Sequence, residues 1–371
     1  MAGQSQTGQP ILIVGPSWVG DMVMAQTLFS ILAKKFPESP VEVLAPAWSE
    51  PLLQRMKEVS ATVVMPVGHG ELSLPAFWQL AQKLRSRRYR AAYILPNSFK
   101  SAVIPMLAGI PRRIGWRGEM RFGLLNDIRL LDEQRYPLMV QRFAALAYPA
   151  GQSLPQTLPQ PCLQVETQRV PELMARFGLD LSRPVLALCP GAEFGPAKRW
   201  PESHYQSVAE VMIKRGWQVW IMGSDNDKEV GEAICGRLKA SGLISNGHIS
   251  TGHVSTGKGQ AQVVNLAGRT ELADAIDLLS CASLVVTNDS GLMHIAAALG
   301  RPLVAIYGST SPAFTPPLGK RVETVAITVD CGPCFERECP LQHLKCLNEL
   351  SPELVLAAID RLAEPLPVPL N

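Results

Sequence analysis

Charged residues are scarce in this chain. Asp, Glu, Lys and Arg make up 18% of its 371 residues, below the roughly 25% of an average soluble domain. With a hydrophobic content of 47%, this argues against disorder and against a coiled coil. No run approaches the ~18 consecutive apolar residues of a membrane-spanning helix, and the chain begins without the basic and apolar regions of an export signal. We therefore expect a compact globular protein that is not exported and whose contact with a membrane is at most peripheral.

Positive charge is concentrated in the first part of the chain. Residues 1–170 hold 18 Lys and Arg against 11 Asp and Glu, whereas the remainder is net negative. This asymmetry predicts that the first part faces an anionic partner. A nucleic acid fits poorly, because the second part is acidic, so we expect no nucleic-acid partner.

Short β-branched runs alternate with segments of helical period, which is typical of parallel α/β sheets. The expected strands are 11–14, 41–44, 91–95, 185–189, 218–222, 263–266, 284–287 and 303–307. The alternation weakens between Leu130 and Pro184, where prolines accumulate, and we place the interdomain linker there. The sequence therefore predicts two α/β domains in tandem. A polar, Gly/Ser-rich stretch at 240–260 is expected to be a surface insertion.

The first predicted strand runs into a turn, Gly15-Pro-Ser-Trp-Val-Gly-Asp21, before a helix that we expect to open at or just after Asp21. Such turns bind anions in doubly wound folds, because glycines let the backbone approach a ligand. The dinucleotide fingerprint G-x-G-x-x-G is missing here, and a carboxylate would repel a pyrophosphate at the same helix end. Asp21 therefore either faces an acceptor hydroxyl or caps the helix.

A loop in the second part, 189–201, has the chemistry of a phosphate site. It places Lys198 and Arg199 just before a helix that starts near Pro201. Cations ahead of a helix N-terminus can bind phosphate, although an ordinary solvated pair has the same sequence. The Gly- and Pro-rich context, with Phe194 and Trp200 nearby, favours the phosphate site.

The sharpest signal follows the strand 284–287. Here Asp289 ends the strand, and Ser290 and Gly291 open a helix whose first N–H groups are free to bind a diphosphate. His294 lies in the first turn and can add a donor, or it can be a buried core residue. The loop after the strand 303–307, and Asp227 after the strand 218–222, come to the same carboxyl edge, where ligands bind in open α/β sheets. Asp227 could accept bonds from ribose hydroxyls or cap a helix.

Two further clusters of residues are open to more than one interpretation. The arginines of 109–121 lie in a loop-rich segment where no helix dipole explains them, so recognition of phosphate or carboxylate is plausible. Four thiols within sixteen residues could bind zinc or an iron–sulfur cluster, but their spacing matches no paired knuckle, so reduced or oxidised thiols remain the alternative. These thiols belong to Cys331, Cys334, Cys339 and Cys346.

Several long motifs together resemble glycosyltransferase family 9, the inverting heptosyltransferases. They are GPSWVGDMVMAQ, LPNSFKSA, GIPRRIGWRGEMR, CPGAEFGPAKRWP and NDSGLMHIAAALGRPLVAIYGSTSPAFTPPL. The resemblance extends from Ile11 to about Leu362 and implies a GT-B fold, in which two Rossmann-like domains with parallel sheets face each other across a cleft. It implies domains at 1–175 for the acceptor and 176–350 for the donor, with a helix and tail at 351–371 returning toward the first domain.

The resemblance also implies substrates and roles. The donor would be ADP-L-glycero-D-manno-heptose, and the acceptor the first heptose of the Kdo–lipid A inner core, at the cytoplasmic face of the inner membrane. Asp21 and Lys198 would be the catalytic residues. We expect donor contacts from Ser17, Gly20, Glu193, Asp227, Asp289, Ser290, Gly291, His294 and Thr310. We expect acceptor contacts from Asn97, Ser98, Lys100, Arg112, Arg113, Arg117 and Arg121.

The expected mechanism is direct displacement. Asp21 would take the proton from the acceptor hydroxyl as it attacks the anomeric carbon and ADP departs. Lys198 and the helix end at Ser290 would stabilise the charge on the leaving diphosphate, so neither a metal nor another cofactor is expected. The alternatives are another sugar-nucleotide GT-B enzyme, either similar to heptosyltransferase I or a sugar-nucleotide epimerase, which would turn over without an acceptor. A non-enzymatic nucleotide-binding or membrane-scaffold module would require Asp21 to be dispensable.

Overall fold

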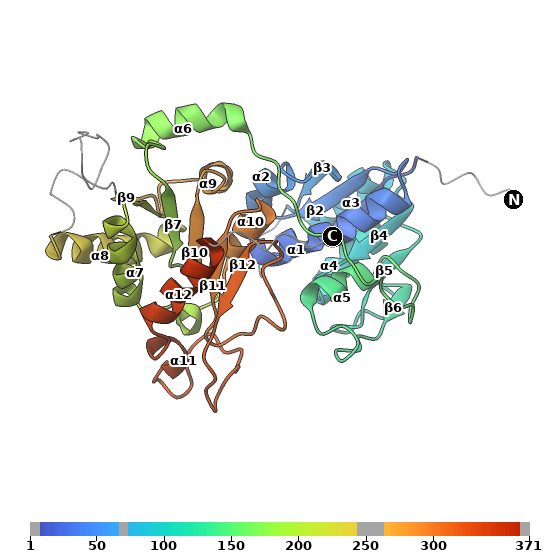
Figure 1. The fold of residues 1–371 in the computed structure, drawn as a ribbon. Coiled ribbons are helices and arrows are strands. Elements are labelled where there is room, and N and C mark those ends of the chain that lie inside the picture. The colour runs from blue at the N-terminus through green and yellow to red at the C-terminus, as the bar shows by residue number, and fades with distance from the viewer. Residues whose placement is uncertain (1–7, 67–72, 243–262, 364–371) are drawn as a thin grey trace, which may run out of the picture. The chain divides into compact units, whose positions relative to one another are not determined.

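The computed structural model describes residues 8–66, 73–242 and 263–363, and its contacts divide the chain into two compact units, Met1–Gln164 and Val165–Asn371. We call these the first and the second unit. Each contains one six-stranded sheet in which every pair of neighbouring strands is parallel (Figure 1). The predicted α/β class with two Rossmann-like parallel sheets is therefore confirmed. The predicted insertion at 240–260 falls almost wholly outside the described residues.

The first unit has the strand order β3-β2-β1-β4-β5-β6. Its strands are β1 Ile11–Val14, β2 Val41–Ala45, β3 Val59–Val64, β4 Ala91–Ile94, β5 Arg113–Trp116 and β6 Asp127–Arg129. Its helices are α1 Val19–Lys35, α2 Glu50–Leu53, α3 Leu74–Arg85, α4 Phe99–Leu107 and α5 Met139–Ala145. The central strands β1 and β4 are buried along their whole length, as expected for a parallel sheet covered on both faces.

The second unit repeats this plan in the order β12-β11-β10-β7-β8-β9. Its strands are β7 Val185–Cys189, β8 Gln218–Ile221, β9 Val263–Asn265, β10 Leu284–Asn288, β11 Leu303–Ile306 and β12 Val322–Val325. Its helices are α6 Val170–Phe177, α7 Glu202–Lys214, α8 Lys228–Ala240, α9 Leu272–Leu279, α10 Gly291–Ala298, α11 Lys345–Asn348 and α12 Pro352–Ala363. Within the described residues, no helix combines the length and apolarity that crossing a bilayer requires.

The strand order creates one switch point in each sheet. In the first unit the chain builds outward from β1 to β3 and then returns to place β4 on the other side of β1. In the second unit β7 and β10 have the same relationship. In open α/β sheets the loops that leave two such strands diverge, and ligands bind at the carboxyl ends of these strands. This is where the sequence places Asp21 in one unit and Lys198 and Asp289 in the other.

The division between the units lies eleven residues before the predicted boundary at 175/176. Helix α6 packs on α9 in the second unit. Arg169, just before α6, pairs with two buried carboxylates of α9, with N–O distances of 2.6 Å to Asp274 and 3.2 Å to Asp277. These ion pairs join residues about a hundred positions apart in the chain. Local composition therefore could not reveal that the residues just before α6 belong to the second unit.

The chain end packs within the second unit as far as it is described. Helix α12 lies against β12, β11 and α7, and Val355, Ala358 and Ile359 are part of the core of that unit. The indole nitrogen of Trp200 donates to the carbonyl of Leu350 at 2.8 Å, just before the helix. Residues 364–371 lie outside the described part, so the predicted return of the tail toward the first unit stays a prediction.

Candidate active site

The second unit brings most of the predicted donor residues to one edge of its sheet. The loops after β7, β8, β10 and β11 leave the carboxyl ends of four neighbouring strands. They carry Lys198, Asp227, Asp289 and Thr310, in that order along the chain. The predicted positions of these loops are therefore confirmed, while the role of each residue stays a prediction.

Asp289 is the centre of a buried polar cluster. Its Oδ2 accepts a bond from the Lys198 ammonium at 2.6 Å and another from the Thr310 hydroxyl at 2.6 Å. The side chains of Lys198 and Asp289 are 13% and 4% exposed. An ion pair that is so far removed from water is costly unless it is well hydrogen-bonded or completed by a ligand. The cluster is therefore well suited to hold a charged group.

Helix α10 begins directly beside this ion pair. Its N-cap is Ser290, whose side chain makes no capping bond, and Gly291 is the first helical residue. The first N–H groups of the helix are thus not capped by that side chain, and the helix dipole favours an anion there. The predicted start of the helix at Ser290–Gly291 is confirmed.

His294 is a buried member of the same site. It is 5% exposed. Burial lowers the pKa of His294 to about 4, the negative charge of Asp289 opposes this shift, and the Lys198 charge adds to it. The imidazole is therefore neutral at neutral pH. His294 is therefore a buried residue that also lies within the electrostatic reach of the ion pair, and its role as a donor contact stays a prediction.

Asp227 uses its two carboxylate oxygens differently. Oδ2 accepts bonds from the backbone N–H and the hydroxyl of Ser224, at 2.9 and 2.8 Å, and so closes the turn from Ser224 to Asp227. Oδ1 is buried and has no hydrogen-bond partner among the described residues, and the Nε atom of Arg199 is in the same situation. Arg199 approaches this oxygen only to 3.8 Å. Unsatisfied buried atoms of this kind need an explanation, and a ribose hydroxyl would provide one.

Sequence reasoning missed Asn288, the residue that ties the loops together. Its Nδ2 donates to the Pro190 carbonyl at 2.6 Å, and its Oδ1 accepts from Tyr205 at 2.9 Å and from the Trp200 N–H at 3.2 Å. Asn288 is fully buried. A polar residue that closes an apolar strand at the carboxyl edge was the available signal.

Glu193 lies at the rim of the same edge. It is exposed, and its carboxylate accepts a bond of 3.3 Å from Asn226. Its assignment to the donor stays a prediction.

Asp21 lies in the first turn of α1, at the carboxyl end of β1. The helix begins at Val19, two residues earlier than predicted, and its N-cap is Trp18. Asp21 is therefore not the N-cap residue, although a carboxylate in the first turn interacts favourably with the helix dipole. Ser17 is exposed and Gly20 is half-buried in the same turn. Their expected contacts with the donor stay predictions.

The predicted acceptor residues separate into two groups at opposite edges of the first sheet. Asn97 and Ser98 follow β4, Lys100 lies in the first turn of α4, and Arg117 follows β5, all at the carboxyl edge. Arg112 and Arg113 lie at the amino end of β5 instead. Arg112 pairs with Asp127 at 3.1 Å, and Arg113 donates to the carbonyls of Ile110 and Leu124.

The structure buries Arg121, which the sequence analysis expected to contact the acceptor. It is 2% exposed, and its guanidinium donates to the carbonyl oxygens of Pro96, at 2.7 Å, and Trp116. Burial lowers its pKa. Arg121 thus fastens the loop after β5 to the loop after β4. The segment predicted to be rich in loops contains the strand β5, whose pairing with β4 the short sequence Arg-Ile-Gly-Trp did not reveal.

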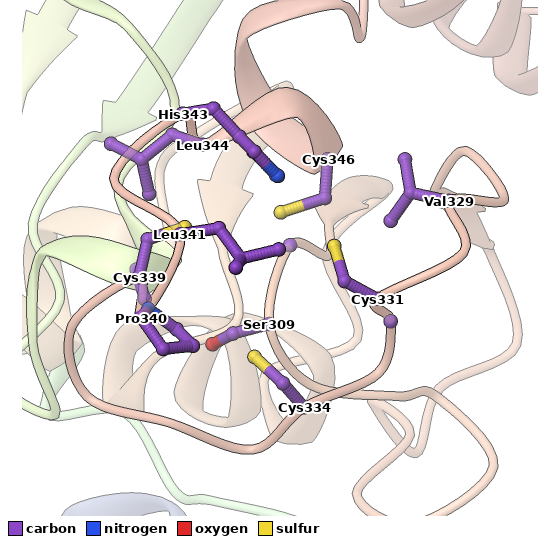
Figure 2. Close-up of a pocket in the computed structure, with 13 residues that line it drawn as sticks. Ser309, Val329, Cys331, Cys334, Cys339, Pro340, Leu341, His343, Leu344 and Cys346 are labelled. Carbon is purple, nitrogen blue, oxygen red and sulfur yellow. The ribbon is translucent and has the colours of Figure 1, made fainter.

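The four clustered cysteines line a cavity together with His343, Leu341 and Ser309, as Figure 2 shows. All eight cysteines of the chain are free thiols. Among the side chains that the structure describes, no group of three or more His, Cys, Asp or Glu is arranged to hold a metal ion. The neighbouring thiols and burial raise the pKa of Cys346.

Comparisons with known proteins agree with this arrangement. The pattern of Glycosyltransferase family 9 (heptosyltransferase) matches residues 77–345. The chain is 45% identical to Lipopolysaccharide heptosyltransferase 2 of Escherichia coli, over 95% of this chain and 98% of that one. It is 43% identical to Lipooligosaccharide heptosyltransferase 2 of Haemophilus ducreyi, over 95% and 99%.

A solved structure extends the likeness to three dimensions. The structure of E. coli ADP-heptose lps heptosyltransferase II matches with a TM-score of 0.80 at 44% identity, covering 95% of this chain and 98% of that chain. The predicted GT-B fold is thereby confirmed. By sequence pattern, close relatives and fold, the chain belongs to glycosyltransferase family 9, the heptosyltransferases.

Proposed function

We propose that this enzyme transfers L-glycero-D-manno-heptose from ADP-heptose to the first heptose of the Kdo–lipid A inner core, in lipopolysaccharide core biosynthesis. The observation that carries the proposal is the buried Lys198–Asp289 ion pair, 2.6 Å long, at the N-terminus of α10. A cation and a helix end with free N–H groups are a fitting receptor for a diphosphate. The printed names of the relatives supply the sugar and the acceptor class.

The proposed chemistry divides its steps between the two units. Asp21 removes the proton of the acceptor hydroxyl, whose oxygen attacks the anomeric carbon and inverts it as the bond to ADP breaks. Lys198 and the first N–H groups of α10 stabilise the negative charge that develops on the departing diphosphate. Asp289, which also accepts a bond from the Thr310 hydroxyl, holds Lys198 in place, and the unsatisfied oxygen of Asp227 accepts a bond from the ribose. We propose no metal and no further cofactor for these steps.

We further infer that the enzyme works at the cytoplasmic face of the inner membrane, as a peripheral protein. Support comes from three exposed apolar side chains of the first unit, Phe99, Met120 and Phe122, which are 47%, 81% and 68% exposed. We call them the 99–122 surface. The backbone N–H of Phe99 donates to the carboxylate of Glu119, the residue before Met120, at 2.6 Å. Lys100 and Arg117 lie beside them in sequence, and such a mixture suits an anionic lipid surface.

The proposal is tested with the substitution Asp21→Asn in the purified enzyme. Loss of the base should lower turnover about a hundredfold or more, while the affinity for ADP-heptose changes little. Both are measured from ADP release, with and without the lipid-linked acceptor. Wild-type turnover in the variant would remove Asp21 from the mechanism. Release of ADP without an acceptor would favour a hydrolase over a transferase, and conversion of the donor into another ADP-sugar without release of ADP would favour an epimerase.

A further inference from the structure

The cysteine-rich loop, residues 331–346, bonds to two of the loops that carry predicted donor contacts, those after β7 and β11. The N–H of Ala197 donates to the Arg337 carbonyl at 3.1 Å, next to Lys198 in sequence. The N–H of Phe335 donates to the Ser309 carbonyl at 2.7 Å, next to Thr310. The loop thus connects the two segments whose side chains meet at Asp289.

Arg337 makes a second connection through its side chain. Its Nε donates to the carbonyl of Phe194 at 2.8 Å, and its guanidinium carbon lies 5.5 Å from the centre of the Phe194 ring. The Lys198 ammonium lies 4.7 Å from the centre of the same ring. The cationic groups of Lys198 and Arg337 therefore both lie near the Phe194 ring. Arg337 also hydrogen-bonds to the backbone carbonyl of Phe194.

The backbone contact between the two loops is close. A Cβ atom on Gly195 would overlap the Arg337 carbonyl oxygen, so only glycine permits this approach. Lys198 has a flexible stem of four methylenes, which costs conformational entropy to fix. Fixing Phe194 and Ala197, which precede Lys198 in the same loop, reduces that cost before a ligand arrives.

We propose that Arg337 is a positioning residue, which acts through the Phe194 loop to hold the Lys198 ammonium at Asp289 for the donor diphosphate. The proposal rests on the function proposed above, because it assumes that Lys198 contacts the donor. The proposed role of Arg337 connects the cysteine-rich loop with the proposed donor site. The thiols of this loop alone did not indicate such a role.

A double-mutant cycle tests this role. Arg337→Ala should lower kcat/KM for ADP-heptose about tenfold and leave the acceptor KM unchanged. In a Lys198→Ala background the same substitution should change kcat/KM less than about twofold, because the group that it positions is gone. Arg237→Ala, which removes an exposed arginine of α8, is the control and should change neither value. Equal effects of Arg337→Ala in both backgrounds would overturn the proposal.

Two further measurements keep the outcome unambiguous. If Arg337→Ala melts at a lower temperature than the wild type, Arg337→Gln, which keeps most of the stem, replaces it in the cycle. The cycle is also measured on ADP affinity by calorimetry, which does not require transfer. Coupling in ADP affinity without any heptosyl transfer would overturn the proposed function and leave the positioning role standing. Additive effects on ADP affinity would overturn the positioning role.

Discussion

At the scale of the residue, the proposed donor site depends on groups whose protonation state is set by burial. Asp289 is surrounded by one cation, one hydroxyl and the start of a helix, while His294 is kept neutral behind it. A neutral imidazole can donate a hydrogen bond without adding to the charge of Lys198. His294 therefore adds no positive charge beside Lys198 at neutral pH.

The lowered pKa of His294 predicts a pH dependence of stability. The unfolded chain takes up a proton near the ordinary value of about 6.5, whereas the folded chain does so only near pH 4. Between these values the unfolded state binds more protons, so the free energy of unfolding falls as the pH falls from 6.5 toward 4. Melting curves of the wild type and His294→Gln should show that the wild type loses more stability in this window. Parallel curves would contradict the shift.

At the scale of the element, the loop after β7 packs closely against Asp227, which lies in the turn after β8. Gly191 follows β7, and a Cβ atom there would overlap the carboxyl group of Asp227 in the turn after β8. One oxygen of that carboxylate accepts bonds from Ser224 and holds the turn, and the other is buried without a hydrogen-bond partner among the described residues. A glycine is thus needed for the contact between neighbouring strand ends.

Gly191→Ala should therefore destabilise the protein by about 1–3 kcal/mol, as overpacking does, and should weaken ADP binding. Gly236→Ala in α8 is a matched control, because a Cβ there meets no atom within 4 Å. The control should stabilise the helix by roughly 0.5–1 kcal/mol and leave ADP binding unchanged. Thermal melts and calorimetry give both quantities. Equal ADP affinity in the two variants would show that Asp227 has no part in binding.

At the scale of the whole molecule, charge and exposed apolar area are unevenly distributed. Residues 1–164 carry 17 Lys and Arg against 10 Asp and Glu, and the rest of the chain is net negative. The 99–122 surface belongs to this basic unit. Both features favour attraction of the first unit to an anionic membrane, where a lipid-linked acceptor would be found.

The double variant Met120→Ser/Phe122→Ser should lose at least about tenfold in affinity for phosphatidylglycerol vesicles, because each large apolar side chain contributes on the order of 1.5 kcal/mol when buried. Vesicle sedimentation measures this. Leu181→Ser/Leu354→Ser, which removes exposed leucines of the second unit, should bind like the wild type. The KM for a deacylated, soluble acceptor should not change. An increase in that KM would instead assign the surface to the acceptor sugar.

The sequence by itself determined the second-unit site in most of its parts. Strand, loop and helix follow one another within a few residues around Lys198, Asp227 and Asp289, and in a parallel sheet every such loop comes to the same edge. Local order along the chain was therefore enough to place these residues together. The same reasoning located the turn with Asp21, and the family resemblance added the substrates.

Only the tertiary structure decided which arginines face solvent and what holds Lys198. Arg112 and Arg117 are five positions apart, but the strand β5 between them carries them to opposite edges of the sheet. Arg121 is buried by carbonyl groups of other loops, and Arg337 meets Phe194 across 143 residues of sequence. Such contacts depend on the packing of distant segments, and neither composition nor spacing encodes them locally.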